Sequence, residues 1–416
     1  MRAAVSGALA PRARALSAAA AAAPPSARAD IGFTPAGAPR WPILLTPGPL
    51  TTSASTKAAM LLDVGSRDGA FTRIVAEVRR ALLAMAGTAA PEHECVIVQG
   101  SGTFGVEAVL GSAVPRAGGR LLVASNGAYG ERMLAIARTL GMELAPPLVH
   151  DERSPLPPAA VVAAAAADAR VTHVAVVHHE TTAGVLNDVE AMGRGLAALP
   201  HAPAFIIDSM SGFGAHALDA RAARAAFVVS SSNKCIEGVP GFSFAICERR
   251  ALQAARSNAR SLALDVHAQW AALEAGGQFR FTPPTHALLA FAQALREHAV
   301  EGGTAGRLAR YAANRAALLQ GMARLGFAPY VAAPAAGEII TTFVVPDDAR
   351  WDFKRAYDSL AERGYVLYPG KTASVESFRV GSIGRIFPED MRAFVAEFER
   401  ELRAQGVALP VRQKRI

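Results

Sequence analysis

Short apolar runs alternate with segments of helical periodicity along residues 95–250. The runs 95–98, 120–124, 171–177 and 204–207 have the length of buried strands, and the segments between them repeat apolar positions at helical spacing. Strands that alternate with helices pair in parallel, because each helix carries the chain back across the sheet in a right-handed crossover. The pattern therefore predicts an α/β domain whose mostly parallel sheet is covered by helices on both faces.

The pattern changes after residue 300, where helices and strands follow in the order helix 305–325, strand 339–345, helix 351–363, strand 366–368, strand 378–380 and helix 388–402. This order is typical of a small α+β domain. We therefore expect an amino-terminal arm and large domain over 41–300, and a small domain over 301–416. Residues 1–40 are rich in alanine, and we expect a disordered or low-complexity extension there; a mitochondrial presequence has a similar composition.

Two polar residues lie where apolar runs end: Asp208 closes 204–208, and Lys234 follows 226–229. Lysine is scarce, with five residues against 38 arginines, which suggests that a retained lysine serves as an amine. A lysine desolvated at a strand end can lose its proton and react with an aldehyde. An aspartate at the carboxyl edge of an α/β sheet can keep a pyridine nitrogen protonated. The pair favours pyridoxal 5'-phosphate as cofactor, although each residue alone also fits a solvated loop lysine or a helix N-cap.

Two further segments fit such a cofactor. Gly100-Ser101-Gly102-Thr103 makes a small turn between a strand and a helix, where backbone N–H groups and the helix dipole can bind phosphate. Tyr129 follows the next strand among small residues and can lie flat against a cofactor ring. An ordinary strand–helix turn and a packing tyrosine are the alternatives, because neither signal is specific by itself.

The adjacent residues His178, His179 and Glu180 raise the question of a metal site. Neighbouring residues of a strand point to opposite faces, and no third ligand lies at metal spacing, so we predict no metal. A hydroxyl from the following Thr181-Thr182 can instead reach a phenolic oxygen of the cofactor. The three cysteines lie in apolar segments and predict no disulfide framework, which favours a reducing, cytoplasmic location.

The net charge of +8 comes mostly from the chain ends. Residues 1–40 carry +4 and residues 412–415 add +3, which leaves +1 for the rest. This argues against a nucleic-acid-binding protein, because such proteins concentrate positive charge on the folded surface. No uncharged apolar run reaches the roughly 20 residues of a membrane span, so we predict no membrane association either.

The segments that carry these residues resemble the class V, fold-type I aminotransferases. The resemblance extends over about 41–390 and rests on TPGPLTTS (46–53), GSRD (65–68), QGSGTF (99–104), NGAYG (126–130), ETT (180–182), DSMS (208–211), SSNKCIEGVPG (231–241), NARSL (258–262), RFTPP (280–284) and YPGK (368–371). It implies a large domain with a mostly parallel seven-stranded sheet, a small carboxyl-terminal α+β domain, and a homodimer with active sites at the interface. Val64 and His179 depart from the pattern, since members usually carry Trp and Cys there.

Position by position, the resemblance implies a role for each residue. Lys234 is expected to bind the cofactor aldehyde and to shuttle the proton, and Asp208 to pair with the pyridinium nitrogen. Tyr129 is expected to stack on the ring and Thr182 to bond its phenolic oxygen. The phosphate is expected to be held by Ser101, Gly102, Thr103, Asn233 and, from the partner subunit, Thr282.

The segments 65–68 and 233–241 are most similar to members that act on a phosphonate. They imply transfer of the amino group of 2-aminoethylphosphonate to pyruvate, giving phosphonoacetaldehyde and L-alanine with ping-pong kinetics. Arg379 is expected to clamp the substrate carboxylate bidentately, and Arg67 is a second candidate for the phosphonate. An alanine or serine transaminase that uses glyoxylate or pyruvate, and a cofactor-binding regulatory protein without catalysis, remain alternatives. A cysteine desulfurase is excluded, because no cysteine follows Cys247.

Overall fold

The computed structural model describes residues 42–372 and 374–415. Its centre is a sheet of eight strands in the order β2-β11-β10-β9-β6-β3-β4, with β5 also paired to β3. The strands β10, β9, β6, β3, β4 and β5 run parallel, whereas β11 is antiparallel to both β10 and β2. The predicted mostly parallel α/β sheet is therefore confirmed. Its long strands are β2 (His93–Gln99), β3 (Arg120–Ser125), β6 (His173–Val177), β9 (Ala204–Asp208), β10 (Ala225–Ser231) and β11 (Phe242–Glu248).

The edge of this sheet is broken, which gives eight strands where seven were predicted. β4 (Glu143–Leu144) and β5 (Leu148–Val149) both pair with β3 on the same side. Pro146 and Pro147 lie between them and have no backbone N–H to donate to β3. The two short strands thus take the place of one longer edge strand.

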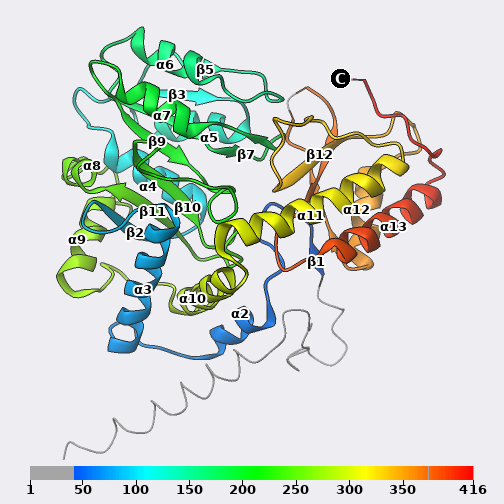
Figure 1. The fold of residues 1–416 in the computed structure, drawn as a ribbon, viewed down its shortest axis with the longest axis horizontal. Helices are drawn as coiled ribbons and strands as arrows, with labels where there is room; N and C mark the ends of the chain where they lie inside the picture. The colour runs from blue at the N-terminus through cyan, green and yellow to red at the C-terminus, as the bar shows by residue number, and fades with distance from the viewer. Residues whose placement is uncertain (1–41, 373, 416) are drawn as a thin grey trace, which may run out of the picture.

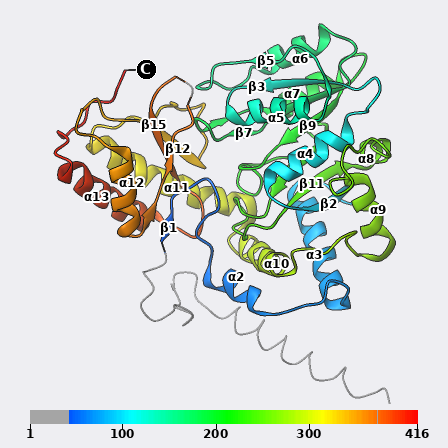
Figure 2. The ribbon, with the colours of Figure 1, turned by 180° about the vertical axis from the view of Figure 1, so that it is seen from behind.

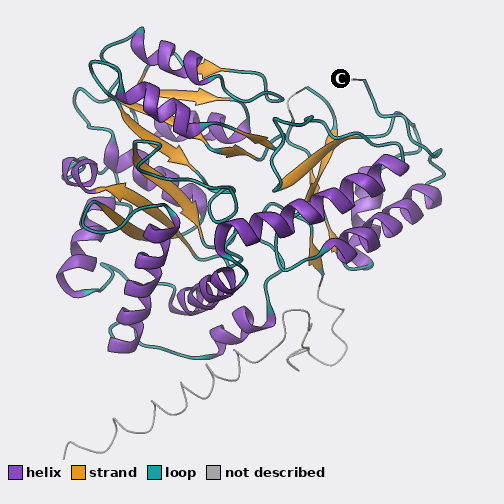
Figure 3. Cartoon of the chain, in the orientation of Figure 1, coloured by secondary structure: helices purple, strands orange, loops and turns teal. Residues whose placement is uncertain are grey.

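Helices cover both faces of the sheet (Figures 1 and 3). Alternate strand residues point to opposite faces, so Val174 and Val176 pack in one core and Ala175 and Val177 in the other. The first core contains α3 (Gly69–Met85), α6 (Pro158–Ala166), α7 (Val189–Ala197) and α10 (Thr285–Val300). The second contains α4 (Gly102–Ala113), α5 (Ala128–Thr139), α8 (Arg249–Ala254) and α9 (Val266–Gly276).

The carboxyl-terminal part of the chain builds a second sheet, in which β12 (Ile340–Val344) and β14 (Tyr368–Pro369) pair antiparallel with β15 (Ser377–Gly381). Side chains of this sheet share a core with α11 (Gly303–Arg324), α12 (Phe353–Glu362) and α13 (Pro388–Ala404). Figure 2 shows the three helices beside this sheet. Figure 1 shows α11 extending from beside the main sheet to this second part. The order of elements agrees with the predicted α+β pattern, while the limits of the two domains stay a prediction.

The predicted amino-terminal arm begins with a short strand and joins the second part to the first. β1 (Ile43–Leu44) pairs in parallel with β13 (Tyr365–Val366), and Gly381 N donates to Leu45 O at 2.9 Å. The arm then continues into α2 (Ala54–Ala58) and a 3₁₀ turn (Ala59–Leu61). The expected extension over residues 1–40 lies outside the described residues.

Some elements were not predicted from the sequence. α10 has apolar residues on most of its faces, so its pattern carries little helical periodicity. β7 (His179–Glu180) and β8 (Val185–Leu186) form a short hairpin after β6. None of the described helices combines the length and the apolar character needed to cross a membrane.

Candidate active site

The carboxyl ends of the neighbouring strands β9 and β10 lead to Asp208 and Lys234 at one edge of the main sheet. Asp208 is the last residue of β9 and is 5% exposed. Its Oδ1 accepts a hydrogen bond from Met210 N at 2.9 Å. Burial, reinforced by the nearby Glu180, raises the pKa of Asp208 to about 6. A buried carboxyl of this kind favours a cationic partner when it ionises.

Lys234 lies in the turn that follows β10. Its Nζ donates to the backbone oxygens of Pro47 at 2.6 Å and Gly48 at 3.4 Å. Gly48 has a φ of +110°, and a Cβ there would lie 2.7 Å from Lys234 Cδ, so the close approach of the arm requires glycine. Burial lowers the pKa of Lys234, although Tyr129 and Asp208 oppose this. The amine can therefore release its proton more readily than an exposed lysine.

Tyr129 and Arg379 reach this edge from two different sheets. Tyr129 is the second residue of α5, which follows β3, and Arg379 is in β15 and is 1% exposed. Burial raises the pKa of the Tyr129 phenol, but the Thr181 side chain and nearby cations that include the Arg379 guanidinium lower it. The guanidinium donates to Pro369 O at 3.0 Å and to Thr181 O at 3.1 Å. β15 thus holds a buried cation beside the carboxyl edge of the main sheet.

Glu180 is the residue whose place in the site the sequence analysis missed. It is fully buried, and its Oε2 accepts from the backbone N–H groups of Tyr129 at 3.2 Å and Gly130 at 3.4 Å. Its Oε1 accepts from the Thr182 hydroxyl at 2.6 Å, while Thr182 Oγ1 accepts from Ala128 N at 2.8 Å. The Thr182 hydrogen is therefore directed at Glu180. In the sequence, Glu180 is an acid at a strand end that precedes two threonines, and it was considered only as a metal ligand.

The start of α4 carries the predicted phosphate-binding turn. Ser101 is the N-cap residue, but its side chain makes no capping hydrogen bond, so the first N–H groups of α4 have no side-chain partner there. A Cβ at Gly102 would lie 2.3 Å from Met210 Sδ, which places this turn against the loop that follows Asp208. Thr103 Oγ1 accepts from Arg132, whose guanidinium lies 4.8 Å from the centre of the Tyr129 ring. The turn and the Tyr129 end of α5 are therefore adjacent.

Asn233 completes the set of predicted residues that one chain brings together. It precedes Lys234, and its Oδ1 accepts from the Ser231 hydroxyl at 3.0 Å. Its backbone oxygen would lie 2.6 Å from a Cβ at Gly48, so the arm packs on the turn at this residue as well.

Arg67 and Thr282 do not join this group within a single chain. Both line a separate cavity of about 180 Å³, together with Ser66 and the segment 278–283. Both are exposed, and no hydrogen bond or ion pair among the described residues links them to Lys234 or Asp208. Thr282 was expected to act from the partner subunit, and this stays a prediction.

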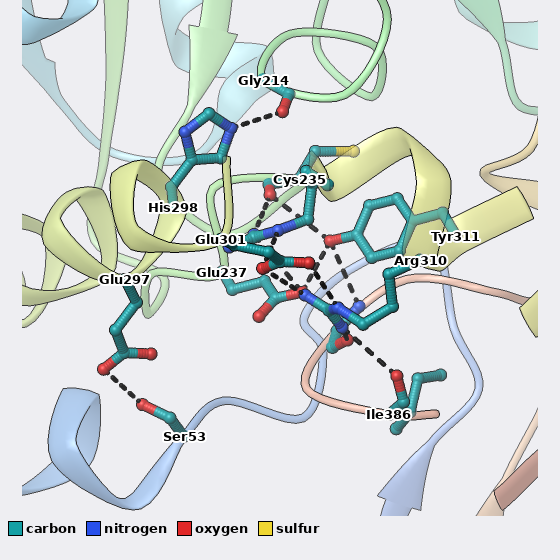
Figure 4. A network of polar contacts seen from close by, with 12 residues as sticks. Ser53, Gly214, Cys235, Glu237, Glu297, His298, Glu301, Arg310, Tyr311 and Ile386 are labelled. Carbon is teal, nitrogen blue, oxygen red and sulfur yellow. Dashed lines mark hydrogen bonds and ion pairs between the residues drawn. The ribbon is translucent and has the colours of Figure 1, made fainter. Parts of the chain in front are cut away.

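A buried ionic network fixes the far side of the Lys234 turn (Figure 4). Glu237 Oε1 pairs with Arg310 at 2.8 Å and accepts from the Tyr311 hydroxyl at 2.7 Å. Arg310 also pairs with Glu301 at 2.6 Å and donates to Ile386 O at 3.2 Å, beyond the end of β15. The network therefore ties the turn that carries Lys234 to α11 and to the segment after Arg379.

Replacement of Arg310 by alanine should destabilise the folded protein by about 1.5–3 kcal/mol, because Glu237 and Glu301 would lose one cationic partner while Arg307 still pairs with both. Urea unfolding of the two proteins measures this difference. Arg324→Ala, at the exposed end of the same helix, is the matched control and should cost less than about 1 kcal/mol. Equal losses in the two variants would contradict a special role for the network.

The two histidines before Glu180 have separate hydroxyl partners. His178 Nδ1 lies 2.9 Å from Ser209 Oγ, and His179 Nδ1 lies 3.0 Å from Ser211 Oγ. Burial lowers the pKa of His178 to about 3, so this ring is neutral at physiological pH. Within residues 42–372 and 374–415, no group of three or more His, Cys, Asp or Glu side chains is arranged to hold a metal ion.

Sequence comparison identifies the family to which this geometry belongs. Residues 53–367 match the family described as aminotransferase class-V. The chain belongs to this family. The aminotransferase fold thus accounts for the lysine and the aspartate on neighbouring strand ends.

The relatives of this aminotransferase match it over nearly its whole described length. It is 47% identical over 369 residues to 2-aminoethylphosphonate–pyruvate transaminase 2 of Burkholderia lata, covering 88% of this chain and 96% of the relative. It is 48% identical over 357 residues to 2-aminoethylphosphonate–pyruvate transaminase of Rhizobium meliloti, covering 85% and 92%. The crystal structure of an alanine–glyoxylate aminotransferase from Nostoc sp. aligns with a TM-score of 0.79 at 23% identity, covering 89% of this chain and 97% of that one, and so shares the fold.

Pyridoxal phosphate is the cofactor of this aminotransferase family, and the residues present fit it. The buried Asp208, whose pKa is raised, matches a cationic ring nitrogen. The uncapped start of α4 at Ser101 matches a phosphate group. The buried amine of Lys234 matches an aldehyde.

Proposed function

We propose that this aminotransferase transfers the amino group of 2-aminoethylphosphonate to pyruvate and releases phosphonoacetaldehyde and L-alanine. The observation that carries the proposal is the grouping of the half-buried Lys234 with the buried Asp208 and Arg379 at one sheet edge, which offers an amine, an acid and an anion-binding guanidinium. The names of relatives that are 47–48% identical over most of the chain support the choice of substrates.

Eight residues are proposed to hold the cofactor in addition to Lys234. Asp208 would keep the ring nitrogen protonated, and Tyr129 would lie against the ring. Thr182 would bond the phenolic oxygen, which requires its hydroxyl to turn away from Glu180. The phosphate would be held by Ser101, Gly102 and Thr103 at the start of α4, by Asn233, and by Thr282 of a second chain. With the cofactor bound, its ring can accept electrons from a bond at the substrate carbon.

The residues of the chain would supply binding and proton transfer. Arg379 would pair with the carboxylate of pyruvate or alanine, and it is already held in place by the backbone oxygens of Pro369 and Thr181. Lys234 would take a proton from the substrate carbon and return it, because its buried amine has a lowered pKa. The buried setting excludes water from the amine and strengthens its interaction with Asp208.

We also propose a homodimer that works in the cytoplasm. Leu262 and Phe281 are 77% and 49% exposed and are joined by Arg280, which donates to Leu262 O and lies over the Phe281 ring. These apolar side chains adjoin the cavity that holds Arg67 and Thr282, so a second chain covering them would also receive Thr282. Light scattering should give twice the chain mass, and a fully active monomer would contradict this arrangement. The three free, buried cysteines fit a reducing compartment.

A screen of amino donors with pyruvate tests the proposed reaction. The purified holoenzyme is mixed with pyruvate and one donor, and L-alanine or the loss of donor is measured. 2-Aminoethylphosphonate should be consumed far faster than serine, and with glyoxylate as acceptor alanine should be a poor donor. A preference for an ordinary amino acid would support the alanine or serine transaminase instead and leave the cofactor residues unaffected.

A further inference from the structure

We propose that Lys371 is the specificity-determining residue that distinguishes a doubly charged phosphonate from a singly charged carboxylate in this site. The proposal rests on the proposed function, which requires one site to accept both groups in turn. Lys371 belongs to the turn after β14, and no role has been assigned to it so far.

Lys371 lies at the active site. Its Nζ is 5.2 Å from the centre of the Tyr129 ring. Burial would raise the pKa of Tyr129, but its hydrogen bond with Thr181 and the charges of Lys371, Lys234 and Arg379 lower it. With Arg132, whose guanidinium lies 4.8 Å from the ring centre, four cations therefore lie around Tyr129, and Lys371 is the exposed one of the four.

The backbone around Lys371 is fixed to β15. Gly370 N donates to Ser377 O at 2.8 Å, and a Cβ at Gly370 would lie 1.9 Å from Ser377 Oγ, so only glycine fits there. Arg379 Nε donates to Pro369 O at 3.0 Å, two residues before Lys371. The turn is thus anchored to the strand that carries Arg379. The backbone of Lys371 therefore has a fixed position relative to the backbone of Arg379, while the exposed Lys371 side chain can move.

Lys371 also differs from the other lysines in its polar partners. The other four lysines each donate to an oxygen: Lys57 to Thr52, Lys234 to Pro47, Lys354 to Asp358 and Lys414 to Glu376. Among the described residues, no carboxylate pairs with Lys371, whose ammonium lies over the Tyr129 ring. Its charge is therefore available to a ligand anion.

The charges of the two substrates explain why a second cation is needed. A carboxylate carries one negative charge, which the buried Arg379 balances in a bidentate pair. A fully ionised phosphonate carries two and has a third oxygen, so a guanidinium alone leaves one charge unpaired. An ammonium on a flexible stem can approach the third oxygen when phosphonate is bound and withdraw to solvent when carboxylate replaces it.

The test compares Lys371→Met, Lys371→Arg and the wild-type holoenzyme, with Lys354→Met as a control at another exposed lysine. For Lys371→Met, kcat/KM for 2-aminoethylphosphonate should fall about 10- to 100-fold, the usual loss of a charged hydrogen bond, mostly through KM. The KM for pyruvate should change less than about two-fold, and Lys371→Arg should restore most of the loss. Equal losses with both substrates, or no loss with the phosphonate, would overturn the proposal.

A binding measurement separates this proposal from the proposed reaction. Ethylphosphonate and propanoate, which have no amino group and cannot react, are titrated into each holoenzyme. Lys371→Met should weaken ethylphosphonate about 10-fold or more and leave propanoate unchanged, and equal affinities in the variant and the wild type would overturn the proposal. If the wild type binds ethylphosphonate through Lys371 but does not consume 2-aminoethylphosphonate, the proposed reaction fails while the role of Lys371 stands.

Discussion

Replacing Lys234 by alanine should abolish both amino transfer and the visible absorbance of the bound cofactor. The amine is buried and its pKa is lowered, so no solvent-exposed base can take its place at the substrate carbon. A positioned proton-transfer group contributes about 10²- to 10⁴-fold, and kcat should fall by at least that factor. Stopped-flow spectroscopy and product analysis with 2-aminoethylphosphonate and pyruvate measure the two effects.

Two matched variants show whether the loss comes from the amine. Lys234→Arg keeps the positive charge but cannot release its proton near neutral pH, so it should be as inactive as Lys234→Ala. Lys57→Ala removes the other lysine that donates to a backbone oxygen of the arm region, and it should keep full activity. An unchanged visible band in Lys234→Ala would show that another amine binds the cofactor.

The second large effect is expected at Asp208. Asp208→Asn keeps the shape of the side chain but removes the charge that would balance a protonated ring nitrogen. Loss of one such electrostatic group costs about 10²- to 10³-fold in kcat, and a loss of that size is expected here. Asp188→Asn, which changes an N-cap carboxylate at the start of α7, should leave kcat unchanged. A fully active Asp208→Asn enzyme would contradict the pairing.

Asp208 should also make the stability of the cofactor-free protein depend on pH. Its pKa is raised from about 4 in the unfolded chain to about 6 in the fold, so between these values the folded state binds more protons than the unfolded state. The contribution of this group to the free energy of unfolding should therefore fall as pH rises from about 4 to 6, by roughly 3 kcal/mol. Denaturant unfolding measures the free energy of unfolding at pH 4.5 and 6.5. Its decline between these pH values should be smaller for Asp208→Asn than for the wild type, and identical declines in both proteins would contradict a contribution of Asp208.

Much of the fold was predictable because its signals are local. The sequence runs that form β2, β3, β6, β9 and β11 are short, apolar and followed by polar residues. They were therefore predicted as strands, with bounds within a few residues of those in the structure. The elements that were missed have weak local signals. α10 is apolar on most of its faces. The break between β4 and β5 depends on two prolines, and their missing N–H groups matter only because this segment lies beside β3.

The sequence by itself determined that Asp208 and Lys234 follow strands of a parallel sheet, and that their side chains lie at its carboxyl edge, because alternation of strand and helix is a property of nearby residues. Only the tertiary structure decided that β9 and β10 are neighbours, that Pro47 O receives the lysine amine, and that Arg379 and Lys371 arrive from a second sheet. It also placed the Glu180 carboxylate against the backbone N–H group of Tyr129 and left Arg67 in a separate cavity. These relations join residues from about 20 to 240 positions apart. They depend on how the faces of helices and sheets pack, and no local pattern of periodicity reveals them.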